Sequence, residues 1–148
     1  MVTENRKARH NYFLEDEYEA GIVLVGTEVK SLRIGNAHLK DSYAKIKNDE
    51  VFVYQMHIGP YPFAHYENHD PSRPRKLLLH KREIKKLYGK VNEMGFSLIP
   101  LRVYFKNGKA KMTIALARGK RKYDKRETIR RRDEKRELDR ARKSNDYI

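Results

Sequence analysis

The sequence predicts a mainly β protein with a few helices, in which short antiparallel strands close into a small barrel and a basic C-terminal tail follows. Three observations support this fold class. Two pairs of β-rich segments flank short polar turns, a segment between them has the apolar spacing of a helix, and the segment 119–148 is charged along most of its length. Short strands with few devices to block a sheet edge favour a barrel, because closure removes the edges.

The first strand is predicted at 20–25, where the apolar run AGIVLV ends at Gly26. A brief helix is expected next in GTEVKSLRIGN, with Thr27 as its N-cap and Gly35-Asn36 as its stop. The segments SYAKIK and VFVYQMHI then flank the letters NDE. Two β-rich runs around a three-residue polar turn predict a first hairpin.

A second hairpin is predicted where LRVYF and KMTIALA flank Asn107-Gly108, a pair that supplies the two positive φ angles of a type I′ turn. Apolar and polar residues alternate along both strands. One face is therefore expected on a core and the other free for solvent or a ligand. The residues expected on the core face are Leu101, Val103, Phe105, Met112, Ile114 and Leu116.

Between the hairpins, the stretch KREIKKLYGKVNEMG predicts a helix that ends at Gly95. Its apolar residues recur at three- and four-residue steps, and they are Ile84, Leu87, Tyr88, Val91 and Met94. We expect this stripe, Tyr88 included, to lie in the core. The preceding stretch YPFAHYENHDPSRPRKLLL contains three prolines and predicts a long loop. An antiparallel barrel with two inserted helices fits the oligonucleotide-binding (OB) fold, among other small barrels.

The 148 residues allow one domain and an appendage, here a barrel domain over 1–118 and a tail over 119–148. The chain has no cysteine, which excludes a disulfide or a thiolate metal site and agrees with a reducing cytoplasm. No apolar run approaches the roughly 20 residues that a membrane span needs. We expect a cytoplasmic, monomeric protein that uses no cofactor.

Charge is distributed unevenly along the chain. Lys and Arg number 34 against 20 Asp and Glu, so the net charge is +14 and a polyanion is the expected partner. Residues 118–148 hold 14 basic and 7 acidic side chains, which leaves +7, half of the total. Basic residues also alternate with aromatic ones in KKLYGK, LRVYFK and KRKYDK. This alternation suits RNA, because cations contact phosphates while free rings, here Tyr104 and Tyr123, stack on unpaired bases.

The sequence contains no recognisable catalytic motif. No glycine-rich segment has the spacing of a phosphate-binding loop, and no Ser or Cys nucleophile motif is present. His65 and His69 stand four apart and could bind a metal in a helix, but the prolines around them predict a loop, so no metal site is expected. The rival hypothesis from this class is a small nuclease that uses His57, His65 or His80.

The tail has the composition of a helix without an apolar face. Asp124 can cap a helix, with Glu127 three residues on as in a capping box. The large aliphatic residues between 124 and 145 are Ile129 and Leu138, which are too far apart to make a continuous seam. We therefore expect the tail to be disordered alone and helical when a polyanion neutralises it. The alternative is a passive solubilising tail.

Three stretches carry a resemblance to a known family, and they are KARHNYFLEDEYEAGIVLVGTEVKSLRIGNAHLKDSYAKI, DPSRPRKLLLHKREIKKLYGKV and GKRKYDKRETIRRR. Between residues 7 and 132 the chain resembles the SsrA-binding proteins, the bacterial partners of transfer-messenger RNA. The resemblance implies an OB-type barrel that is not an enzyme. It also implies binding to the tRNA-like domain of that RNA and its delivery to stalled ribosomes for trans-translation, which tags the stalled peptide and releases the ribosome. An elongation factor that carries the charged RNA is a further implied partner.

The resemblance assigns residue roles in two regions. Glu19, Leu78 and His80 fall on RNA-binding positions of the family, although some relatives carry Asn where this chain has His80. The tail would lie in the empty messenger channel of the ribosome and reach its decoding centre, where Tyr123 would stack on a base. The tail residues that match the family are Lys120, Arg121, Tyr123, Asp124, Lys125 and Arg126.

Glu19 poses a physical question, because phosphates repel a carboxylate. It is expected to accept hydrogen bonds from base amino groups or sugar hydroxyls, or to orient a neighbouring Arg. His80 is expected either to cap the following helix or to contact RNA. The alternative to the whole interpretation is a structural ribosomal protein or a general RNA-binding protein.

Overall fold

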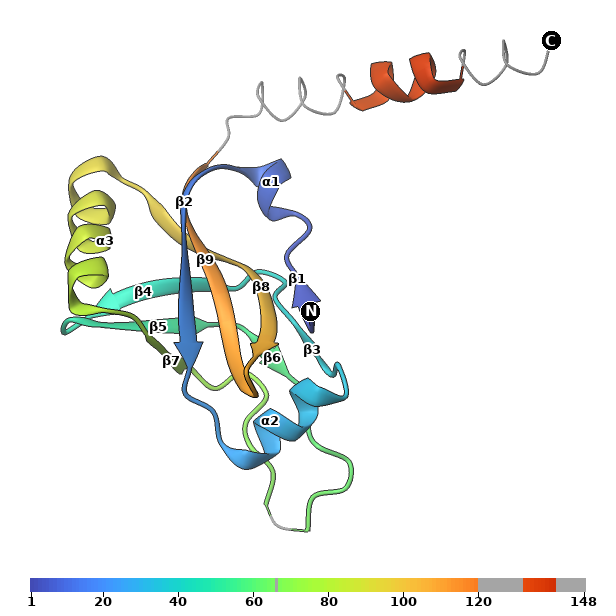
Figure 1. Ribbon diagram of the computed structural model, residues 1–148, viewed down its shortest axis with the longest axis vertical. Helices are drawn as coiled ribbons and strands as arrows, with labels where there is room; N and C mark the ends of the chain where they lie inside the picture. The colour runs from blue at the N-terminus through green and yellow to red at the C-terminus, as the bar shows by residue number, and fades with distance from the viewer. Residues whose placement is uncertain (66, 120–131, 141–148) are drawn as a thin grey trace.

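The computed structural model describes residues 1–65, 67–119 and 132–140 (Figure 1). Up to residue 119 the elements alternate between strands and three short helices. In chain order they are β1 (Thr3–Glu4), α1 (Ala8–Asn11), β2 (Tyr12–Ile22), α2 (Gly26–Arg33), β3 (Ala37–His38), β4 (Tyr43–Lys47), β5 (Glu50–Tyr54), β6 (His57–Ile58), β7 (Arg75–Leu78), α3 (Lys81–Met94), β8 (Ser97–Lys106) and β9 (Lys109–Gly119).

Strand pairing closes the sheet into a barrel. The seven-stranded sheet has the order β1-β8-β4-β5-β7-β2-β9, and β9 also pairs with β8. All of these pairings are antiparallel, and β3 and β6 form a small second sheet. Figure 1 shows α3 beside the barrel and α2 at one end of it. This architecture confirms the predicted mainly β barrel with a few helices.

The strand β2 is much longer than the sequence predicted. It begins at Tyr12, pairs with β9 along most of its length, and ends at Ile22 rather than at residue 25. The acidic stretch EDEYE concealed it, because charged residues are rare in strands. These carboxylates are exposed, whereas Ala20 and Ile22 are buried. Alternation was therefore present from Glu17 to Ile22, whereas a bulge between Leu14 and Glu17 interrupts it.

Both predicted hairpins are confirmed. The turn between β4 and β5 consists of Asn48 and Asp49, whose φ angles of 51° and 60° are positive, so it is a two-residue turn rather than three. The turn between β8 and β9 is formed by Asn107 and Gly108 at φ 52° and 75°, as the type I′ prediction required.

A bulge in β8 changes which side chains share a face. The register of β8 against β9 shifts between Pro100 and Arg102. Leu101 therefore leaves the face of Val103, and its prediction as a member of that core face is wrong. It lies instead in a second small cluster, whose buried members are Ala8, Ile99, Leu101, Ala115 and Ala117. The second face of β9 is therefore partly covered, where the alternation predicted a free surface.

The helix α3 is confirmed with its end at Gly95, which takes a left-handed conformation with φ 69°. Leu87 in the middle of its apolar stripe is fully buried. Tyr88 and Met94, however, are 56% and 65% exposed, so the prediction that the whole stripe is core is wrong. The helix lies beside the barrel, so it buries a narrow line of contact rather than the full stripe.

The helix α2 begins one residue before the predicted cap. Its N-cap is Val25, and Thr27 lies inside the first turn, so the prediction of Thr27 as N-cap is wrong. The Thr27 hydroxyl is instead hydrogen-bonded to Nδ1 of His69, at 2.8 Å. The other ring nitrogen of His69 lies 2.8 Å from the carbonyl oxygen of Ile58. His69 therefore links the long loop to α2 and to β6.

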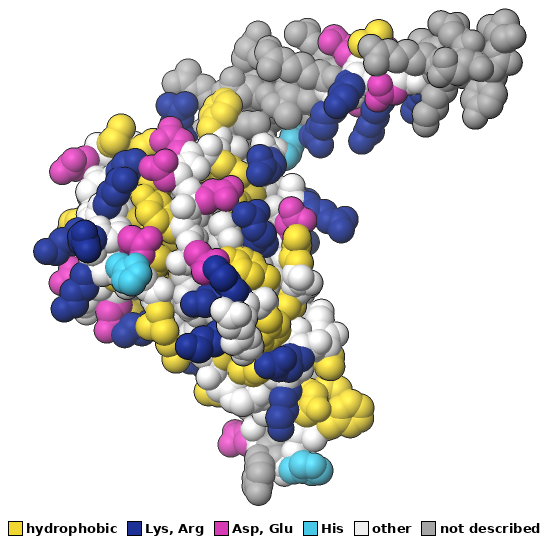
Figure 2. All heavy atoms as spheres, viewed as in Figure 1, with side chains coloured by type: hydrophobic (Ala, Val, Ile, Leu, Met, Phe, Trp, Pro, Cys, Tyr) yellow, Lys and Arg dark blue, Asp and Glu magenta, His cyan; other side chains and the backbone are white. Residues whose placement is uncertain are grey.

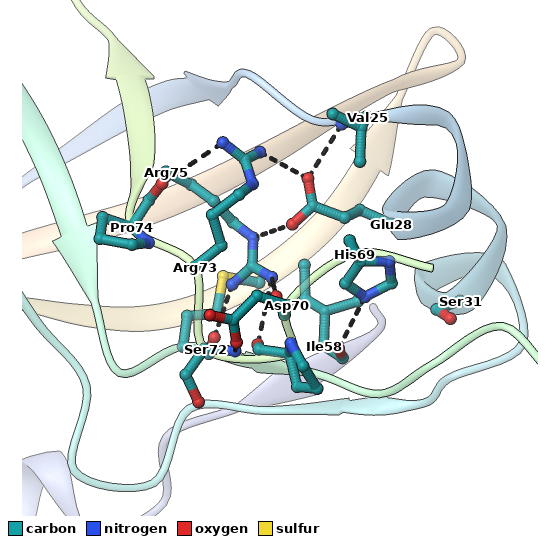
Figure 3. Close-up of polar contacts among 12 residues, drawn as sticks. Val25, Glu28, Ser31, Ile58, His69, Asp70, Ser72, Arg73, Pro74 and Arg75 are labelled. Atoms are coloured by element: carbon teal, nitrogen blue, oxygen red, sulfur yellow. Dashed lines mark hydrogen bonds and ion pairs between the residues drawn. The ribbon is translucent and has the colours of Figure 1, made fainter. Parts of the chain in front are cut away.

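A buried ionic cluster fixes that same loop (Figure 3). Glu28 of α2 is fully buried, and it accepts hydrogen bonds from Arg73 at 2.6 Å, from the backbone N–H of Val25 at 2.9 Å and from Nε of Arg75. Arg75 also donates to the carbonyl of Met56 at 2.6 Å. Burial alone would raise the pKa of Glu28, but these donors outweigh it and lower that pKa. The cluster thus sets where the loop ends and β7 begins.

Residues 132–140 are helical and their side chains are exposed, including Leu138 at 62%. This agrees with a tail helix that has no buried apolar face. The predicted helix start at Asp124 lies outside the described residues. Among the helices in the described ranges, none has the length and apolar character to cross a membrane.

Candidate nucleic-acid interface

A groove of about 660 Å³ brings together the three residues predicted to bind RNA in the barrel domain. Glu19 comes from β2, Leu78 from the end of β7 and His80 from the start of α3. Its apolar floor includes Ile22 and Phe105. Residues far apart in the sequence thus form one surface.

Leu78 is an aliphatic side chain presented to solvent, with 53% of its surface exposed. Its neighbour across the sheet is Gly21. A Cβ at Gly21 would lie 3.4 Å from the Cβ of Leu78, so glycine leaves one flank of Leu78 uncovered. An exposed leucine beside bare backbone is a suitable apolar platform for the face of a base or a sugar.

His80 occupies the N-cap position of α3. Its backbone N–H donates to Oε1 of Glu83 at 3.1 Å, which is the reciprocal half of a capping box. The Glu83 carboxylate thus accepts from the backbone N–H of His80. The exposed imidazole of His80 lines the groove. The His80 side chain thus lies at the helix cap and also where a ligand in the groove could contact it.

Glu19 is held by a tyrosine and a lysine of β8. The Tyr104 hydroxyl donates to Oε2, and Nζ of Lys106 lies 3.4 Å from Oε1. The bond from Tyr104 lowers the pKa of Glu19, and the charge of Lys106 lowers it further, so the carboxylate is ionised at neutral pH. The expected alternative of a neighbouring Arg is not what the structure shows, because Arg102 pairs with Glu17 at 3.2 Å instead.

Two further cations line the groove, and sequence reasoning missed both. Lys109 and Lys111 lie at the start of β9, next to the turn. The alternation KAKM contained the signal, because both lysines lie on the face opposite Met112. Figure 2 shows Lys and Arg side chains spread over one face of the molecule, with fewer acidic side chains among them. The groove therefore offers cations as well as an apolar platform.

The tail residues Lys120, Arg121, Tyr123, Asp124, Lys125 and Arg126 lie outside the described residues. Of the tail that is described, Arg132 lies with Nη2 at 3.2 Å from Nδ1 of His10.

The histidines of the nuclease hypothesis belong to three separate elements. His57 in β6 stacks on His38 with ring centroids 4.6 Å apart, and burial lowers the pKa of His57. His65 lies in the long loop, and His80 lies at α3. Over the described ranges, no three His, Asp or Glu side chains gather as a metal site would require. This placement does not favour a shared catalytic centre.

Comparison with known proteins decides the family. The model of the family described as SmpB protein matches residues 2–144. The chain belongs to the SmpB family. It is 57% identical to the SsrA-binding protein of Shouchella clausii (strain KSM-K16) over 141 residues, which cover 95% of this chain and 90% of that protein. It is 59% identical to the SsrA-binding protein of Acetivibrio thermocellus over 145 residues, which cover 98% and 94% of the two chains.

A solved structure of an SmpB chain shows the same fold. That chain, from the work described as "tmRNA-SmpB: a journey to the center of the bacterial ribosome", is 48% identical and superposes with a TM-score of 0.69. The match covers 86% of this chain and 94% of that one. The SmpB fold therefore extends over the barrel described above.

Proposed function

We propose that this protein binds the tRNA-like domain of transfer-messenger RNA and delivers that RNA to stalled ribosomes for trans-translation. The observation that carries the proposal is kinship over almost the whole chain with proteins named SsrA-binding protein. A protein with this role on the ribosome is expected to act in the cytoplasm. The protein acts as a binding factor that performs no chemistry on the RNA.

The groove supplies the chemistry for recognising a folded RNA. Leu78 offers an apolar platform, Lys109 and Lys111 offer charge to phosphates, and Glu19 and His80 offer polar atoms to base edges or sugars. Folded RNA is recognised mostly by shape and by unstacked bases rather than by reading a helix groove. A small surface that combines apolar, cationic and polar groups suits that mode.

The tail takes a separate role on the ribosome. Residues after Gly119, the last residue of β9, enter the empty messenger channel and form a helix there, with Tyr123 stacking on a decoding-centre base. The exposed helix over 132–140 and the surplus of basic residues in the tail support this assignment. RNA would supply the packing partner that the barrel does not. The monomeric state and the elongation factor as a further partner belong to the same proposal.

A truncation tests the division between barrel and tail. Gly119 pairs with Tyr12 at the end of β9, so the deletion begins at residue 120. The truncated protein is expected to bind the tRNA-like domain with nearly full affinity in a filter-binding assay. The truncated protein is also expected to support no peptide tagging in a reconstituted translation reaction on a message without a stop codon. Loss of RNA affinity in the truncated protein would contradict the division.

A further inference from the structure

The outer surface of β9 lies between two strands that bear long polar side chains. Glu19 on β2 and Arg102 on β8 both pair with Thr113 of β9, which is short and 6% exposed. Tyr104, the next outward residue on β8, reaches across β9 to Glu19. The small residue on the middle strand leaves room for that contact. The hydrogen bond therefore joins the two sides of the surface next to the groove.

The bond leaves Glu19 with acceptor capacity. A carboxylate has about four lone-pair sites. Tyr104 occupies one on Oε2 and Lys106 occupies one on Oε1, so one site on each oxygen remains for a ligand. Lys106 and Lys111 offset the negative charge, because both lower the pKa of Glu19. A carboxylate in this setting can accept hydrogen bonds from RNA with less repulsion of its phosphates.

The two donors differ in how firmly they hold the carboxylate. A tyrosine ring has two side-chain torsions, whereas lysine has a flexible four-carbon stem. The Lys106 side chain is also 57% exposed, and its contact of 3.4 Å is long. Tyr104 is half-buried, and it makes the shorter contact. The orientation of Glu19 is therefore set mainly by Tyr104.

We propose that Tyr104 is a positioning residue of the RNA-binding groove, whose hydroxyl fixes Glu19 to accept hydrogen bonds from base amino groups or ribose 2′-hydroxyls. Tyr104 acts through Glu19, and its ring need not touch the RNA. The inference rests on the proposed function, because it presupposes RNA in the groove. A carboxylate held in this way has a role on a surface that binds a polyanion, because it accepts hydrogen bonds that a cation cannot accept.

The test measures binding of the full chain to a transcript of the tRNA-like domain. The variants are Tyr104→Phe, which removes the hydroxyl and keeps the ring, Glu19→Ala, and the two combined. Tyr54→Phe on β5, outside the groove, is the matched control, and thermal unfolding verifies that each variant is folded. Tyr104→Phe is expected to raise Kd about three- to tenfold, which corresponds to the net contribution of about one ordinary hydrogen bond. The control is expected to bind like the wild type.

The combined variant separates positioning from direct contact. In the Glu19→Ala background, Tyr104→Phe is expected to change Kd less than twofold, because the group it positions is already absent. If the two substitutions instead raise Kd by independent factors that multiply in the combined variant, the inference is overturned, since Tyr104 would then contact the RNA itself. Wild-type affinity in Tyr104→Phe alone would overturn it as well.

A spectroscopic measurement reports the contact without RNA. NMR can follow the side-chain carboxyl carbon of Glu19 during a pH titration. In this measurement, Tyr104→Phe is expected to raise the pKa of Glu19 towards its usual value. An unchanged pKa would show that Tyr104 does not orient the carboxylate. Failure of the proposed function would look different, because the wild-type protein itself would then fail to bind the tRNA-like domain.

Discussion

Leu78 shows how little of the proposed RNA-binding groove can be recognised from the type of a single residue. Its side chain is a leucine in a β-rich segment, and from the sequence alone it belongs in a core. It is exposed because it is the last residue of β7, with Gly21 beside it on the outer face. The family resemblance marked the position, and the structure supplies the physical reason.

A substitution at Leu78 is expected to affect binding and leave stability unchanged. Leu78→Ala removes aliphatic carbons that RNA would cover, so binding to the tRNA-like domain should weaken by about 1–2 kcal/mol. The unfolding free energy should change by about 0.5 kcal/mol or less, because the residue is exposed. Filter binding and denaturant unfolding measure the two quantities.

Ile34 provides the matched control for Leu78. It is also an exposed aliphatic residue, with 56% of its surface accessible, and it lies at the C-cap of α2, outside the groove. Ile34→Ala should leave RNA affinity unchanged. Equal losses for Ile34→Ala and Leu78→Ala would mean that RNA covers the surface without a preferred site.

The hydrogen-bond partners of Glu19 could not be predicted from the sequence. The bond from Tyr104 spans 85 positions, and no local pattern encodes it. Two hydrogen-bonding partners of a carboxylate on different strands become visible only when strand register is known. By contrast, Lys109 and Lys111 followed from simple alternation and could have been predicted.

Elements with specific turn residues were predicted well. Asn107-Gly108 imposes its turn through backbone conformation, and Gly95 ends α3 in the same way. Two features were not predicted from the sequence, each for a physical reason. The strand β2 carries exposed charges and a bulge between Leu14 and Glu17, and the bulge in β8 shifts the face of Leu101. Both depend on partner strands, which composition does not describe.

The loop between β6 and β7 depends on the cluster around Glu28. Glu28→Gln removes the charge opposite two arginines, of which Arg75 is fully buried. Breaking a buried ion pair from one side costs about 3 kcal/mol or more, because the remaining charge lacks a partner. Denaturant unfolding should show this loss. RNA affinity should fall with it, because the loop leads into β7 and Leu78.

Glu50→Gln is the corresponding control at the surface. Glu50 pairs with Lys76 at 3.2 Å, and both side chains are more than two-fifths exposed. Such a pair contributes about 0.5 kcal/mol or less. A loss in Glu50→Gln as large as that in Glu28→Gln would show that burial does not account for the cost.

The same cluster should give the protein a specific sensitivity to acid. Because the pKa of Glu28 is lowered in the folded state, its contribution is fully present above its ordinary value of 4.5 and is lost as pH falls through the lower folded value. The wild type should therefore lose stability in this acidic range, whereas Glu28→Gln should lose less. Unfolding midpoints between neutral pH and pH ~3 measure the difference. Parallel curves would contradict the assignment.

At the scale of the whole molecule, charge sets both affinity and its dependence on salt. Each neutralised phosphate releases counterions, so affinity for RNA should fall steadily as salt rises. Removing 120–148 deletes 13 basic and 7 acidic residues, a net +6. If the tail acts only on the ribosome, the affinity of the full and truncated chains for the tRNA-like domain should depend on salt concentration with nearly equal slopes. With ribosomes, the truncated chain should show the smaller slope, and a flat response in the full chain would remove the electrostatic argument.

The pairing of β2 with β9 also governs the order in which the protein is completed as it is made. Tyr12 pairs with Gly119, so one of the first strands synthesised waits for the last strand of the barrel. Contacts that span this much sequence form slowly and late. Glu19 likewise has no Tyr104 to hold it until β8 has emerged. A nascent chain therefore assembles the groove around Glu19 only after β8 and β9 have been synthesised, although β2 is made much earlier.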